Sequence, residues 1–201
     1  MSVHLPPLPP VGGESTGVNV ADVVSREHRE LLALCDELTA DGTDAGRRRV
    51  LAEVVSAGLS RHLSAEEQYV YPAVRAAVPD GERLAEREIA EDRALLESLR
   101  LLEDAGDAER RERAEDVGRR LRRHADAATG ELLPLLERMV SAEELIRLGN
   151  RVEVAREAAP TRPHPQTPAT PPWNKVVDPA VAIVDKVRDV VGRRTTYPQD
   201  L

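Results

Sequence analysis

The strongest constraint on the fold is an internal repeat. Residues 62–72 and residues 124–134 each begin with a histidine and end with a proline, and an arginine precedes each histidine. Further upstream, the hexapeptide at 27–32 (EHRELL) returns at 91–96 as EDRALL. The spacing from His28 to His62 is nearly equal to the spacing from Asp92 to His124, so the same sequence pattern occurs twice in the chain. If each copy is a pair of helices, the two pairs form a four-helix bundle in which the repeated positions converge.

Composition and apolar spacing indicate that these segments are helices. Ala, Leu, Glu and Arg dominate, and all four favour helix. The chain has no Phe and one Trp, so aliphatic residues must fill its core. We predict an all-α, up-down four-helix bundle with a short fifth helix, spanning residues 19–158. The helices are expected at about residues 19–39, 44–77, 82–103, 108–140 and 141–158, with bends near Pro72 and Pro134.

The segments that flank this bundle differ from it in composition. Residues 1–18 are rich in Pro and Gly and are expected to be disordered. Residues 159–175 hold a cluster of prolines and are expected to form an extended linker. Residues 176–201 are expected to form an amphipathic helix and a tail, because the valines from Val177 to Val191 follow helical spacing. That helix could pack on its own bundle, meet a partner or touch a membrane, and its mixed charges favour the bundle over a lipid surface.

Charge and motif content exclude several classes of protein. The net charge is −8 with both signs interleaved, whereas a nucleic-acid binder would show a concentrated basic face. We see no signal peptide and no apolar run long enough to cross a membrane. A single cysteine cannot form an internal disulfide, so we expect a cytoplasmic location. No nucleophile motif or phosphate-binding loop is present, so any enzymatic activity should be metal-dependent redox chemistry such as peroxide decomposition.

Three of the five histidines occupy matched positions of the repeat, which indicates a metal site. The predicted ligands are His28, His62, Glu66, Asp92 and His124. His62 and Glu66 are four residues apart, so both side chains project from one face of a helix. Imidazoles and carboxylates together suit iron, manganese or zinc. Glu88 lies one turn before Asp92 and is expected to be an exposed acid.

This arrangement resembles the hemerythrin-like family, the HHE cation-binding domain. The residues that carry the resemblance are Glu27-His28, His62 with Glu66-Glu67 and Tyr71-Pro72, Glu91-Asp92, and His124 with Pro134. The resemblance covers roughly residues 20–140, and the tail is similar to that of actinobacterial members. It implies an up-down bundle that holds a non-haem di-iron centre. In such proteins the centre serves oxygen, nitric oxide or peroxide chemistry, or iron sensing and storage.

Two positions depart from the pattern of that family. The family has a histidine on the third helix, where this chain has Asp92. It also has a glutamate four residues after the histidine of the fourth helix, where this chain has Ala128. Glu131 is one turn too far along the helix to replace that glutamate. The half-site made by the first and second helices is therefore intact, while the half-site on the third and fourth helices has lost a bridging carboxylate.

These departures leave two hypotheses open. In the first, the chain binds iron in an altered centre, either one ion or a di-iron centre with one fewer bridge and Asp92 as a terminal ligand. Iron is expected ahead of zinc or manganese, with a diatomic molecule or peroxide as the small ligand. In the second, the bundle binds no metal and serves as a structural or interaction module, with its histidines bonded to Glu66 and Asp92. In either case the C-terminal helix is a candidate contact for a protein partner.

Overall fold

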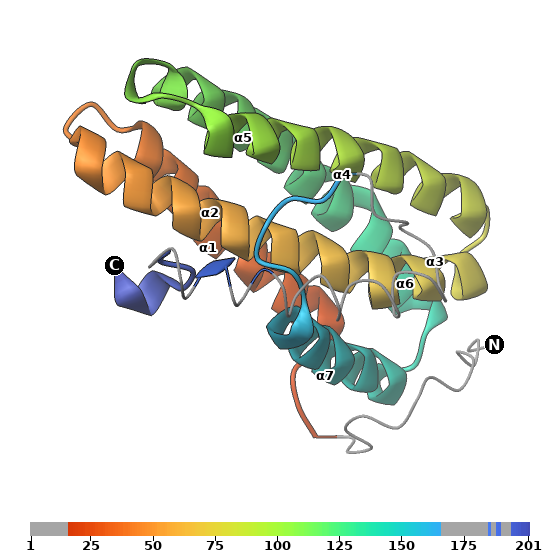
Figure 1. Cartoon of the computed structure of the whole chain (residues 1–201). Helices are drawn as coiled ribbons and strands as arrows, with labels where there is room; N and C mark the ends of the chain where they lie inside the picture. Colours follow the sequence, from red (N-terminus) through yellow and green to blue (C-terminus); the bar gives the residue numbers. More distant parts are fainter. Residues whose placement is uncertain (1–15, 166–184, 186–187, 190–193) are drawn as a thin grey trace.

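The computed structural model describes residues 16–165, 185, 188–189 and 194–201, and over these residues it contains helices and no strand. The elements are α1 (Val20–Thr39), α2 (Ala45–Ala65), the π-helical turn η1 (Glu66–Val70), α3 (Tyr71–Ala77), α4 (Gly81–Asp104), α5 (Asp107–Ala127), the π-helical turn η2 (Ala128–Leu132), α6 (Leu133–Met139), α7 (Ala142–Ala158) and the short 3-10 turn η3 (Pro198–Asp200). The α1–α2 and α4–α5 connections lie at the same end of the bundle (Figure 1). The predicted all-α, up-down bundle is confirmed, and α7 is its short fifth helix.

Polar side chains begin three of these helices. The side chain of Asn19 accepts from the backbone N–H of Ala21 at the start of α1. Asp44 caps α2, and Ser141 caps α7. Each cap satisfies a backbone donor that has no partner within its own helix, so the helix starts are defined by local sequence.

Each of the two long helices that carry a proline contains a π-helical turn just before it. At η1 the backbone N–H of Tyr71 donates to the carbonyl of Glu66, five residues back, and at η2 Leu133 donates in the same way to Ala128. The prolines that follow, Pro72 and Pro134, lack the N–H of a regular α turn, and their rings crowd the preceding turn. The predicted bends are thus present as widened turns.

Two aliphatic clusters fill the bundle, and a polar layer separates them. On α1, Val24 belongs to one cluster and Leu31 to the other, with buried His28 between them. On α4, Asp92 stands between the two clusters in the same way. The polar groups of this layer are therefore enclosed by aliphatic side chains on both sides.

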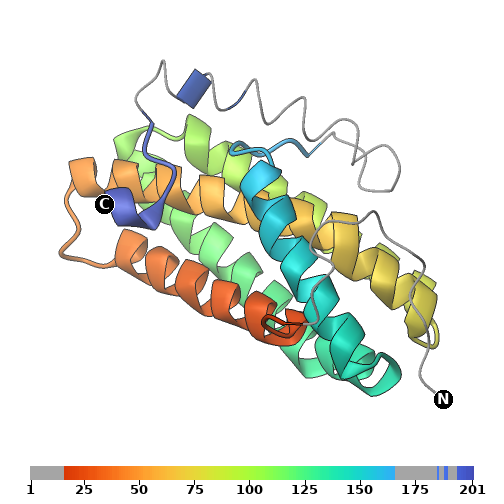
Figure 2. The ribbon, with the colours of Figure 1, turned by 90° about the horizontal axis from the view of Figure 1, so that it is seen from below.

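α7 runs across α1 and α2 instead of extending the bundle (Figure 2). Its Leu148 and Val152 are fully buried. Gly149 permits a close approach, because a Cβ at that position would lie 2.2 Å from the carbonyl oxygen of Val18. Packing therefore holds α7 firmly against the start of α1.

The described C-terminal residues contact the bundle. Arg194 forms an ion pair with Glu103 of α4, and Arg61 of α2 donates from Nη2 to the carbonyl of Thr196 at 2.6 Å. Residues 1–15, 166–184, 186–187 and 190–193, which include most of the predicted linker and amphipathic helix, lie outside the described residues. Among the described helices, none combines the length and the apolar character needed to cross a membrane.

Candidate metal centre

Four buried side chains bring one donor atom each to a single spot in the polar layer. They are His28, His62, Glu66 and His124, and their donor atoms all lie within 4.8 Å of one another. His62 Nε2 lies 2.9 Å from His28 Nε2 and 3.6 Å from Glu66 Oε2. His124 Nε2 lies 3.1 Å from the same Glu66 oxygen. Neighbouring ligands of a metal ion with bonds of about 2.1 Å lie about 3.0 to 3.4 Å apart in octahedral or tetrahedral geometry, so separations of this order suit one shared cation.

Three segments of the bundle bring these donors together. His28 comes from the middle of α1 and His124 from the last turn of α5. His62 lies in the last turn of α2, and Glu66 is the first residue of η1. One turn separates His62 from Glu66, as the spacing of four predicted.

Hydrogen bonds account for only part of this cluster: His62 Nε2 and His28 Nε2 lie within hydrogen-bonding distance of each other, but His124 is left out. His124 Nε2 is buried and has no hydrogen-bond partner among the described residues, although Glu66 Oε2 is only 3.1 Å away. The two groups are close but do not point at each other. Donors arranged in this way point at a common centre, where a cation would satisfy all of them.

The charges of the metal-free cluster are unevenly distributed. Burial and the neighbouring His62 lower the pKa of His28 to about 2, so its imidazole is neutral. Burial alone would lower the pKa of His124, but the carboxylates of Glu66 and Asp92 outweigh it and raise that pKa well above the usual value. Burial would raise the pKa of Glu66, but His62 and His124 overcome it and lower that pKa. Glu66 is therefore ionised, and a bound cation would displace a proton from His124.

Two further carboxylates stand behind the histidines. Glu27 Oε2 accepts from His62 Nδ1 at 2.8 Å, and Asp92 Oδ1 lies 3.0 Å from His124 Nδ1. Each carboxylate thus faces the nitrogen that points away from the cluster. A carboxylate in that position orients an imidazole and makes its other nitrogen a better metal ligand.

Tyr71 contacts one carboxylate behind the histidines, Asp92, and the carboxylate of the cluster, Glu66. Its hydroxyl donates to Asp92 Oδ2 at 2.6 Å and lies 3.3 Å from Glu66 Oε2. Burial, together with the charge of Asp92, raises the pKa of Tyr71 well above its usual value. The hydroxyl therefore stays protonated and serves as a donor at neutral pH.

Of the five predicted ligands, the structure gathers four in one cluster and places Asp92 behind His124. Glu27, which was not among the predicted site residues, is buried against His62. Its signal was available, because Glu27 falls on the apolar stripe of α1 between Val24 and Leu31.

Glu88 is also not the exposed acid that we expected. It is buried and forms an ion pair with Arg87 at 2.7 Å. It occupies the buried stripe of α4 that also contains Ala85 and Asp92. Glu88 is buried because it falls on the side of α4 that faces the bundle. Its charge does not prevent this burial, because Arg87 compensates it.

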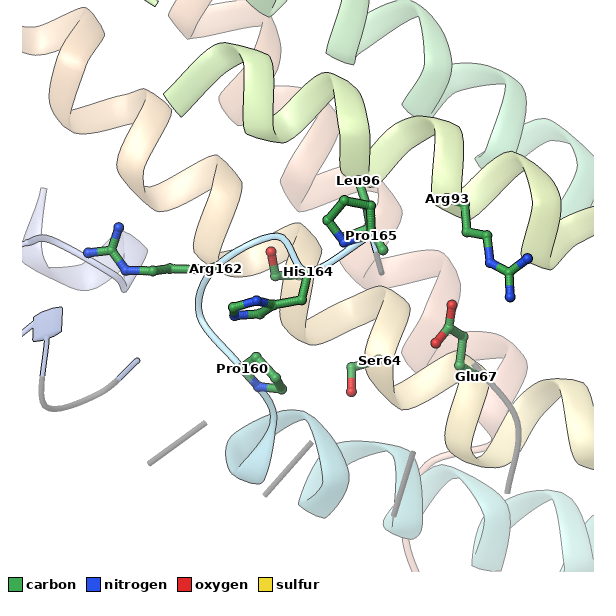
Figure 3. A pocket seen from close by; sticks show the side chains of 9 residues that line it. Ser64, Glu67, Arg93, Leu96, Pro160, Arg162, His164 and Pro165 are labelled. Carbon is green, nitrogen blue, oxygen red and sulfur yellow. The ribbon is translucent and has the colours of Figure 1, made fainter. Parts of the chain in front are cut away.

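The surface pocket shown in Figure 3 is separate from this cluster. It lies between α2, α4 and the segment that follows α7, and its lining includes Glu67, Arg93 and His164. Its volume of about 30 Å³ suits a single water molecule. None of the four clustered side chains lines it.

Comparisons with known proteins agree with this fold. Residues 19–136 match the family described as the hemerythrin HHE cation binding domain. An uncharacterised hemerythrin-like protein of Schizosaccharomyces pombe is 26% identical over 178 residues, which cover 87% of each chain. The crystal structure of a hemerythrin HHE cation binding domain-containing protein from Mycobacterium kansasii superposes with a TM-score of 0.61 at 20% identity, covering 70% of this chain and 86% of that one. The matched range contains all four clustered donors, and the chain belongs to the hemerythrin HHE cation-binding family.

Proposed function

We propose that the chain binds one non-haem iron ion through His28, His62, Glu66 and His124, and offers it to oxygen, nitric oxide or peroxide. The observation that carries this proposal is the convergence of four buried donor atoms within 4.8 Å. Three imidazoles and one carboxylate form a donor set that non-haem iron accepts, and the same set is compatible with zinc or manganese. A six-coordinate ion would keep positions open for a small ligand.

The second half of the repeat supports one ion over two. Ala128 stands where a second bridging carboxylate would be required, and it is buried among aliphatic side chains. Asp92 Oδ2 accepts from Tyr71, and Asp92 Oδ1 lies 3.0 Å from His124 Nδ1, the ring nitrogen that points away from the cluster. We therefore assign Asp92 to orienting His124, whereas the sequence analysis had counted it among the ligands.

Bound iron would supply reversible redox chemistry and an attachment point for the small ligand. The residues of the chain would do the rest. The two aliphatic clusters flank the polar layer, and the Tyr71 hydroxyl oxygen, which carries a proton, lies 3.3 Å from Glu66 Oε2. A neutral diatomic ligand or peroxide fits an enclosed site of this kind better than a large anion does.

Elemental analysis tests the proposal directly. The protein is loaded anaerobically with ferrous iron and desalted, and metal per chain is then measured. We expect one iron per chain, and none in the His62→Ala variant, which lacks a ligand of the intact half. Two irons in the wild-type chain would contradict the single-ion site, and retained iron in His62→Ala would contradict the ligand set.

Two further measurements separate the remaining alternatives. Competition of ferrous iron against zinc and manganese identifies the preferred ion. Nitric oxide and hydrogen peroxide, added to the iron-loaded protein and followed by electron paramagnetic resonance and peroxide consumption, test the small ligand and any enzymatic activity. A folded wild-type protein that retains no metal would favour the alternative, a metal-free structural or interaction module.

A further inference from the structure

One side chain outside the family match is connected to the metal cluster. Arg156 lies in the last turn of α7, beyond the matched range 19–136. Its Nη1 donates to Glu27 Oε1 at 2.6 Å, while the other oxygen of Glu27 accepts from His62 Nδ1 at 2.8 Å. Arg156, Glu27 and His62 therefore form a chain of contacts from α7 to a predicted ligand.

The contact with Glu27 determines how His62 can bind a metal. A histidine that binds through Nε2 carries its proton on Nδ1 and needs an acceptor there. Glu27 is that acceptor, and both side chains are almost completely buried. If the Glu27 carboxylate moved, the ring of His62 would lose the contact that fixes its orientation and its tautomer.

Glu27 in turn depends on Arg156. A buried carboxylate requires a compensating charge or several donors, and Arg156 supplies a charged donor at close range. A cavity of about 670 Å³ lies beside this pair, between α1, α2, α7 and the C-terminal residues, and both Glu27 and Arg156 line it. Without Arg156, the Glu27 carboxylate could turn away from His62 and into this cavity.

The position of Arg156 is determined by packing. Leu148, Val152 and Ala155 bury one face of α7 against the bundle, and the Gly149 backbone lies against Val18. The guanidinium therefore reaches Glu27 from a rigid helix and not from a loose loop. A rigid support is what a positioning residue needs to hold a ligand in place.

We infer that α7 is part of the metal centre and that Arg156 is a positioning residue, which fixes His62 for metal binding through Glu27. The inference rests on the proposed metal-binding function. It extends the centre beyond the matched domain, to a helix whose sequence contributes no ligand.

The structure offers a matched control. Arg26 of α1 pairs with Glu153 of α7 at 3.0 Å, so it joins the same two helices by an Arg–Glu ion pair that is more exposed than the pair of Arg156 with Glu27. Neither Arg26 nor Glu153 contacts a clustered histidine in the described structure. Arg26→Gln removes an α1–α7 ion pair without touching Glu27, whereas Arg156→Gln removes the contact with Glu27.

The experiment compares wild type, Arg156→Gln, Arg156→Lys and Arg26→Gln in two ways. In metal-free protein labelled with ¹⁵N-histidine, nuclear magnetic resonance reports the tautomer of His62. In the second measurement, anaerobic titration gives the dissociation constant for ferrous iron. Circular dichroism verifies that each variant is folded.

We expect His62 to carry its proton on Nδ1 in the wild type and in Arg26→Gln, and to show a mixture of tautomers in Arg156→Gln. The dissociation constant should rise about tenfold in Arg156→Gln and less in Arg156→Lys, which keeps the charge. A wild-type tautomer and affinity in Arg156→Gln would overturn the inference, as would equal losses in Arg156→Gln and Arg26→Gln. If Arg156→Gln does not fold, Arg156→Met, which keeps the aliphatic stem and removes the charge, takes its place, and a wild-type tautomer and affinity in that variant would overturn the inference.

The failure of this inference can be distinguished from failure of the proposed function. If the wild-type protein binds no ferrous iron, the proposed function is wrong. The tautomer comparison needs no metal and still decides whether Arg156 positions His62.

Discussion

The two halves of the repeat share one backbone design but place different chemistry on it. In the first half, His62 is followed one turn later by Glu66 at the start of a π-helical turn. In the second half, His124 is followed one turn later by Ala128, again at the start of a π-helical turn. The backbone geometry has been kept where the ligand has been lost. The π turn therefore follows from the proline beyond it and does not depend on the carboxylate.

The halves also differ in how they hold their histidines. Glu27, the residue just before His28, orients His62 in the first half. Asp92, at the position that corresponds to His28, faces His124 in the second half. Asp92, which replaces the histidine of the family, thus lies behind His124, as Glu27 lies behind His62 in the first half. The second half supplies one ligand and its support, and the first half supplies the rest of the cluster.

Replacing Glu66 with alanine makes the first half resemble the second and should have the largest effect. Loss of one of four ligands removes about 3 kcal/mol of metal binding, which weakens ferrous iron binding about a hundredfold or more. Anaerobic titration measures this loss. Glu67→Ala changes the neighbouring acid, which is not in the cluster, and should bind iron like the wild type. Similar losses in both variants would mean that Glu66 is not a ligand.

The reverse change, Ala128→Glu, makes the second half resemble the first. Ala128 is buried, so the new carboxylate would lose its hydration in the metal-free protein and should cost about 3 kcal/mol of stability. Added iron should restore that stability, and the number of bound ions should rise toward two per chain. Chemical denaturation with and without iron measures the effect, and Ala127→Glu, at a partly exposed neighbour, is the control. If Ala128→Glu is destabilised and still binds one ion, a second iron site would need more than this one added carboxylate.

Asp92→Asn tests the support of the second half. Removing the charge behind His124 should weaken iron binding by about tenfold and leave one ion per chain. Glu88→Gln, which changes another buried acid one turn away on α4, should have little effect on affinity. A fall in stoichiometry, from two ions in the wild type to one in Asp92→Asn, would instead make Asp92 a ligand.

The pH dependence of the metal-free protein should distinguish His28 from His124. His28 has a pKa of about 2 when folded, owing to burial and to His62, and about 6.5 when unfolded. Its contribution to stability is complete above pH 6.5 and declines as the pH falls from 6.5 towards 2, by about 1.4 kcal/mol at pH 5.5. His124 has the opposite sign, because its raised pKa adds stability below pH 6.5 that is lost as the pH rises through the raised value.

Denaturant unfolding of metal-free wild type and His28→Gln at pH 7.5 and 5.5 measures this contribution. Acidification should destabilise the wild type by about 1 kcal/mol more than the variant. Equal losses in the two proteins would mean that His28 accepts a proton in the folded state as readily as in the unfolded chain.

Much of the site could be predicted from one sequence because its geometry is local or repeated. The spacing of His62 and Glu66 places both on one helix face, and the repeat brings His28 and His124 to the same layer. The ligand role predicted for Asp92 could not be decided in this way. Whether its carboxylate points into the cluster or behind His124 depends on how α4 is rotated against α5, and spacing along one helix does not define that rotation.

The sequence by itself determined the helices, the bends before the two prolines and the layer in which the histidines meet. These features depend on periodicity, on the missing N–H of proline and on contacts between near neighbours in the chain. Only the tertiary structure decided which carboxylates stand behind which histidines, and that Arg156 reaches Glu27 from a crossing helix. Those contacts join residues far apart in the chain. Their partners are chosen by the packing of whole helices, because a buried charge takes the nearest compensating group that the fold provides.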